Sequence, residues 1–91
     1  MTQEKTAEEI RQLRAHVQEL LNVYVRQIGL GFGLKVSDEY IQQEDWLYLV
    51  VVPDTGTVRA YDYAKALTDV ENKLRREEHV EHVLLVPALA A

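Results

Sequence analysis

Apolar side chains recur every three or four residues through the first third of the chain, which is the spacing of one face of an amphipathic helix. They form a single stripe: Ile10, Leu13, Val17, Leu20, Leu21, Tyr24, Val25 and Ile28. Thr6 and Glu9 have the spacing of a capping box, and Gly29 suits the left-handed position that follows a helix. This pattern predicts a first helix from Thr6 to Ile28.

Two further segments have the patterns of strands. From Leu34 to Gln42 apolar and polar residues alternate, which is typical of an edge strand with one solvent-facing side. From Trp46 to Val52 every residue is hydrophobic, which is typical of a central strand that is covered on both faces. A polar turn at 43–45 separates the two strands, and the turn-forming residues 53–56 end the second.

Helical spacing returns after this turn. Tyr63, Leu67, Val70 and Leu74 recur at intervals of four, three and four, so we predict a second helix from about Thr57 to Glu77. An alternative is that 57–61 forms a short strand and that Asp62 is the N-cap. On the polar side of this helix, Glu71 and Arg75 have the i, i+4 spacing of an ion pair.

The strongly apolar run from Val83 to Ala90 is predicted to be the third strand. A strand, a helix and a following strand form a right-handed crossover, which places the last strand parallel to Trp46–Val52. We therefore predict one α+β domain over 1–91. It is a two-layer α/β sandwich in the order α-β-β-α-β, with a three-stranded mixed sheet and two amphipathic helices. A competing arrangement would place one helix on each face of the sheet.

If both helices pack on one face, the other face is left apolar and uncovered. Contiguous exposed apolar surface is rare on monomers and usually marks an interface. We predict an interface formed by Trp46, Tyr48, Val50, Val52 and Leu85. Trp and Tyr are enriched at protein interfaces, whereas the acidic residues near these aromatics, Glu39, Glu44 and Asp45, disfavour base stacking.

Composition narrows the classes of function. With 47% hydrophobic and 27% charged residues, the chain has the balance of a folded domain. A net charge of −5 disfavours nucleic acid, and the one dense basic cluster, Lys73, Arg75 and Arg76, suits the last turn of a helix. No cysteine is present. The charged N-terminus is unlike a signal peptide, and Leu47 to Pro53 is too short to span a membrane. We expect a cytoplasmic protein.

Three short motifs suggest chemistry. Gly29, Gly31 and Gly33 resemble a phosphate loop, but such a loop follows a strand and precedes a helix, which is the reverse of the order here. Asp54-Thr55-Gly56 resembles the catalytic triplet of aspartic proteases, but a turn between strand and helix also favours these residues. His79 and His82, with Glu78, have ligand types suited to zinc or a similar ion.

His16 and Ser37 complete the inventory of residues that could take part in catalysis. His16 borders the apolar stripe of the first helix, where a histidine without a functional role is the plainer interpretation. Ser37 is the only serine, and its strand has no nucleophile elbow. We therefore expect no catalytic residues and no cofactor.

The α-β-β-α-β order resembles that of type II KH domains, but their GxxG loop, set between two helices, is missing here. The pattern from Leu34 to Pro87 also resembles the cytoplasmic domain of cation-diffusion facilitators, which dimerises, although no motif is shared. From the residues themselves we predict a non-enzymatic protein–protein interaction or assembly module, either homodimeric or a small subunit of a larger complex. The alternative is a ligand- or metal-responsive domain that uses the His79/His82 region.

Overall fold

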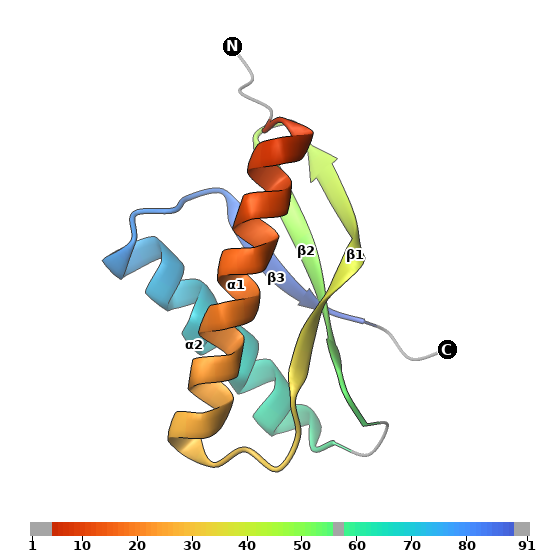
Figure 1. Ribbon diagram of the computed structural model, residues 1–91, viewed down its shortest axis with the longest axis vertical. Coiled ribbons are helices and arrows are strands. Elements are labelled where there is room, and N and C mark those ends of the chain that lie inside the picture. The colour runs from red at the N-terminus through yellow and green to blue at the C-terminus, as the bar shows by residue number, and fades with distance from the viewer. Residues whose placement is uncertain (1–4, 56–57, 89–91) are drawn as a thin grey trace.

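The computed structural model describes residues 5–55 and 58–88. Two helices and three strands follow one another in the predicted order (Figure 1). They are α1 (Ala7–Ile28), β1 (Leu34–Gln43), β2 (Trp46–Pro53), α2 (Ala60–Glu77) and β3 (Val83–Pro87). No helix in the described part of the chain is long and apolar enough to cross a membrane.

The three strands form one mixed sheet in the order β1-β2-β3. β1 pairs with β2 antiparallel, from Leu34 opposite Pro53 to Gln43 opposite Trp46. β3 pairs with β2 in parallel, with Leu49 opposite Leu85. The fully apolar strand β2 is therefore central, and the alternating strand β1 lies at an edge, as the sequence predicts.

Both helices cover the same face of this sheet. Leu47, Leu49 and Val51 of β2 are at most 1% exposed and belong to one core cluster with residues of both helices, such as Val17 and Leu67. The alternate residues of β2 are only partly buried or exposed. Since α1 and α2 also contact each other, the helices form one layer, with α1 nearer β1 and α2 nearer β3 (Figure 1). The competing arrangement with one helix per face is wrong.

The ends of α1 follow from its sequence. The Thr6 hydroxyl accepts a hydrogen bond from the Glu9 backbone at 3.2 Å, and the Glu9 carboxylate accepts one from the Thr6 backbone. Gly29 adopts the left-handed conformation, with φ of 67°, and its N–H bonds the Val25 carbonyl. A side chain at this φ would be strained, so glycine ends the helix at low cost. Ile28, in the predicted stripe, is 52% exposed at the end of the helix.

The beginning of α2 and the end of β3 differ from the prediction. α2 begins at Ala60, with Arg59 as an N-cap that makes no side-chain capping bond. Asp62 lies in the first turn of α2 instead of at the N-cap. Thr57 lies outside the described residues. β3 ends at Pro87, whereas the predicted strand continues to Ala90, which lies outside the described residues.

Strand β1 also departs from regular alternation. Val36 pairs with Val51 but Tyr40 pairs with Leu49, so three residues of β1 face the single residue Val50. Such a bulge bends an edge strand and twists it away from regular pairing. Because two residues are added, Tyr40 keeps the same side as Val36 by register, although it is 41% exposed.

Candidate functional site

The face of the sheet turned away from the helices is the candidate site, and we call it the open face. By register its apolar residues are Trp46, Tyr48, Val50 and Val52 of β2, with Ile41 of β1 and Leu84 and Val86 of β3. Each of these seven side chains is either partly buried or exposed. Lys35, opposite Val52, and Gln43, opposite Trp46, lie on the same face of β1. The apolar surface therefore extends over β2 and β3, and on β1 it is limited to Ile41.

The two large exposed residues of the open face lie towards the hairpin that joins β1 and β2. Ile41, 57% exposed, pairs with Tyr48, and Trp46, 36% exposed, is the first residue of β2. The Trp46 indole lies against the His82 imidazole, with ring centroids 5.0 Å apart and planes tilted by 58°. This contact gives Trp46 a fixed neighbour while part of the indole stays exposed.

Four of the five predicted interface residues lie together on the open face, and Leu85 does not. Leu85 pairs with Leu49 and is 6% exposed, so it faces the helices. Its neighbours Leu84 and Val86 face outwards instead. An unbroken apolar run such as Val83–Val86 contains no polar residue to show which alternate side chains point towards the core, and the prediction therefore chose the wrong phase.

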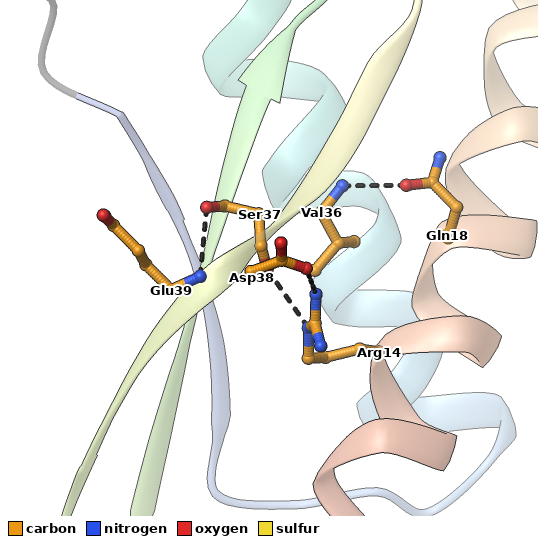
Figure 2. A network of polar contacts seen from close by, with 6 residues as sticks. All are labelled: Arg14, Gln18, Val36, Ser37, Asp38 and Glu39. Carbon is orange, nitrogen blue, oxygen red and sulfur yellow. Dashed lines mark hydrogen bonds and ion pairs between the residues drawn. The ribbon is translucent and has the colours of Figure 1, made fainter.

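The outer edge of β1 is occupied by side chains of α1 (Figure 2). The Gln18 amide donates to the Leu34 carbonyl at 2.8 Å and accepts from the Val36 N–H at 2.8 Å. One turn earlier, the Arg14 guanidinium donates to the Ser37 carbonyl at 3.1 Å and to the Asp38 carboxylate at 2.7 Å. Gln18 thus makes the two bonds that a neighbouring strand would make.

The outer edge of β3 is blocked in a comparable way. The Leu85 N–H, which points away from β2, donates to the Glu71 carboxylate of α2 at 2.9 Å. Two residues later Pro87 has no N–H to offer. Edge strands with free backbone groups invite pairing with another chain, and here groups on both edges already have partners. Glu71 also makes the predicted pair with Arg75, at 3.7 Å.

A polar cluster joins the helices on the side opposite the open face. The Tyr24 hydroxyl of α1 donates to the Asp69 carboxylate of α2 at 2.6 Å, and Lys65 donates to the same oxygen at 2.7 Å. The bonds from Lys65 and Tyr24 lower the pKa of Asp69. Burial and the bond to Asp69 raise the pKa of Tyr24, and the bond to Asp69 raises the pKa of Lys65.

The structure does not gather the proposed metal ligands into a site. His16 pairs with Glu78 between α1 and the end of α2, and His82 lies against Trp46. His79 lines a shallow cleft with Lys5, Glu9 and Glu81. Within residues 5–55 and 58–88, no group of three or more His, Cys, Asp or Glu side chains is placed to hold a metal.

The aspartic-protease motif lies in the turn after β2. The Asp54 N–H donates to the Gly33 carbonyl at 3.0 Å, and the Asp54 carboxylate packs so close to Gly33 that a side chain there would displace it. Gly56 lies outside the described residues. These contacts give Asp54 a structural role where the chain leaves the sheet.

Comparison with protein-family models, with curated proteins and with solved structures finds no match to this chain in any of the three.

Sequence reasoning missed the residues that close the sheet edges. Gln18 and Arg14 flank the apolar stripe of α1, and Glu71 flanks that of α2. Their position at the border of an apolar stripe is the only indication that the sequence gives of this role, and most polar residues at such positions are solvated. Their roles depend on which strand each helix lies beside, and that is a property of the assembled fold.

Proposed function

We propose that this protein is a non-enzymatic association module that docks through the open face, and that its primary partner is a second copy of the same chain. The observation that carries the proposal is the uncharged, apolar surface across β2 and β3, which neither helix covers. The same seven side chains would contribute from each copy. In a two-fold dimer the same patch of each chain packs on the other, so a single apolar face can form the whole interface.

The size of the open face sets the expected affinity. The three strands lie about 4.8 Å apart and average about 25 Å in length, so the open face covers roughly 350 Å² per chain. At ~25 cal/mol per Å², burying this area on both chains contributes roughly 17 kcal/mol before the costs of association, which are of order 4–15 kcal/mol or more. The total buried area of roughly 700 Å² is below that of a standard interface, so we expect a weak, reversible dimer with Kd in about the micromolar range or above.

The closed edges favour docking by faces over pairing of strands. Strand addition needs a free row of N–H and C=O groups. Gln18 and Arg14 use groups of β1, Glu71 uses one of β3, and Pro87 supplies none. Packing of two sheets face to face needs no backbone group at all, because it uses only side chains.

The test is the molecular mass in solution across a range of concentrations. The monomer is 10.5 kDa, and we expect light scattering and sedimentation to show reversible conversion to twice that mass. Val50→Asp places a charge in the middle of the open face and should give a folded monomer. Val50→Thr keeps the branched shape and should weaken the dimer less.

Thr68→Asp is the matched control, because Thr68 is exposed on α2 in the helix layer. It should leave the dimer unchanged. A wild-type mass of 10.5 kDa at every concentration would contradict the homodimer. Equal effects of Val50→Asp and Thr68→Asp would show that association uses another surface.

A further inference from the structure

The charges at the two ends of the open face are unequal. At the hairpin end lie Glu44 and Asp45, in the turn between β1 and β2. Both are exposed, and neither forms an ion pair with another described residue. This end of the open face therefore carries two acidic side chains that have no ion-pair partner within the described part of the chain.

The opposite end is close to neutral. Lys35, opposite Val52, is exposed and likewise forms no ion pair within the described residues. Asp54 lies just beyond Pro53 at the same end, so one positive and one negative charge lie there. Along β2 the two ends are about 20 Å apart, which is more than the Debye length of about 8 Å at physiological ionic strength.

We propose that two copies pack their open faces with strands running antiparallel, so that the acidic hairpin end of each copy lies over the Lys35 end of the other. This inference rests on the proposed function. Of the face-to-face alignments with two-fold symmetry, two keep the strands of the two sheets aligned, and they differ in the direction of the axis. With the axis along the strands, Glu44 and Asp45 of one copy lie near the same residues of the other, which is repulsive.

With the axis across the strands, each β1 lies over the partner's β1 in the reverse direction. Lys35 of each copy then faces the partner's hairpin, and the two acidic clusters lie at opposite ends of the interface. The apolar middle, centred on Tyr48 and Val50, is the same in both alignments. The charges at the rim therefore decide between them.

Asp45→Lys distinguishes the alignments by the sign of its effect on the dimer Kd. In the antiparallel dimer the substitution places a second positive charge against Lys35 of the other copy, and Kd should rise roughly three- to tenfold at low salt. In the parallel dimer it would relieve repulsion between acidic ends, and Kd would fall. Lys35→Glu should also raise Kd, and the double variant should return it close to the wild-type value.

Arg76→Glu, in the last turn of α2, makes the same change in net charge as Lys35→Glu away from the open face and should leave Kd unchanged. A spin label on Gln43→Cys adds a distance, because the chain has no other cysteine. The antiparallel dimer should place the two labels beyond about 20 Å, and the parallel one within about 15 Å.

The outcomes separate this inference from the proposed function. A dimer that Val50→Asp dissociates but that Asp45→Lys tightens would overturn the antiparallel alignment and leave docking by the open face standing. A fall in Kd with Lys35→Glu, or a short distance between the labels, would do the same. A chain that is monomeric at all concentrations would overturn both.

Discussion

The two faces of the central strand differ in what covers them and hardly at all in what they are made of. On one face, Leu47, Leu49 and Val51 lie beneath both helices and are almost fully buried. On the other face, Tyr48, Val50 and Val52 stay partly exposed. Hydrophobic composition alone therefore does not tell the core of this domain from a surface.

Polar groups distinguish the two sides more clearly. On the helix side, side chains at the borders of the helices reach the sheet edges or each other, as Gln18, Glu71 and Asp69 do. No hydrogen bond of this kind reaches the open face among the described residues, and the polar side-chain groups on that face are those of Trp46 and Tyr48 in β2 and of Lys35 and Gln43 in β1. A face that other parts of its own chain do not bind remains available to a second copy.

Adjacent leucines of β3 give the largest expected difference between the two faces. Leu85 faces the helices and Leu84 faces outwards. Leu85→Ala leaves a cavity in the core and should lower the free energy of unfolding by about 2–4 kcal/mol. Leu84→Ala should lower it by about 1 kcal/mol or less. Urea denaturation at a concentration where the protein is monomeric measures both.

Association should respond in the opposite order. Leu84→Ala removes open-face surface and should raise the dimer Kd, whereas Leu85→Ala should leave Kd unchanged under conditions where the variant stays folded. Equal losses of unfolding free energy in the two variants would mean that the faces do not differ as described.

The edge clamp formed by Gln18 gives the next largest effect. Gln18→Ala leaves the Leu34 carbonyl and the Val36 N–H without the Gln18 amide, and the free energy of unfolding should fall by about 1–2 kcal/mol. Gln12→Ala on the same helix is the control, because Gln12 is exposed and bonds only to Glu8 among the described residues. Loss of the clamp should also produce oligomers larger than a dimer, since a free edge of β1 permits strand pairing with another chain.

Equal unfolding free energies for Gln18→Ala and Gln12→Ala would contradict the role of the clamp. An unchanged mass distribution with reduced stability would show that the bulge and Pro87 protect the edges without Gln18.

Much of the fold could be predicted because local patterns agree with the tertiary structure. The capping box at Thr6, the helix end at Gly29 and the switch between periods of two and of three to four residues each depend on neighbours along the chain. The two-layer packing was predicted less directly, since the prediction was based on the need to bury the long apolar runs. The bulge after Val36 was missed, although three consecutive polar residues, Ser37, Asp38 and Glu39, interrupt the alternation at that point.

The candidate site could be predicted only in part. Trp46, Tyr48, Val50 and Val52 follow from strict alternation along one strand that begins at a recognisable turn. Leu85 was misplaced by one residue because β3 has no turn of its own to set its phase. The sequence also left His79, His82 and Glu78 as candidate ligands, because spacing does not reveal that Glu78 pairs with His16.

A smaller effect is expected in the connection between α2 and β3, which takes part in neither face. His79 has a φ of 54°, in the left-handed region that favours glycine. His79→Gly should remove this strain and raise the free energy of unfolding by about 0.5–1 kcal/mol relative to His79→Ala, which keeps a Cβ. Thermal or urea unfolding measures the difference, and the dimer Kd should be the same in both variants. A less stable glycine variant would contradict the strain.

The smallest expected effect is a pH dependence confined to the helix layer. The pKa of Asp69 is lowered from 3.8 by its bonds to Lys65 and Tyr24. Folding therefore favours the ionised carboxylate, and this contribution is present above a pH of about 4 and is lost as the pH falls through the lowered pKa. Asp69→Asn removes it, so the stability difference between wild type and variant should shrink below that pH.

At alkaline pH the direction of the pH dependence of stability reverses. The pKa values of Lys65 and Tyr24 are raised above 10.5 and 10.0, so their contributions hold below those values and disappear as the pH rises through the raised pKa. Between these limits the difference in unfolding free energy between wild type and Asp69→Asn should be flat. Urea midpoints at monomer concentrations, taken from about pH 3 to pH 11, measure it. A difference that keeps its full size at pH 3 would show that Asp69 acts through packing, and the titratable link between the helices would have to be abandoned.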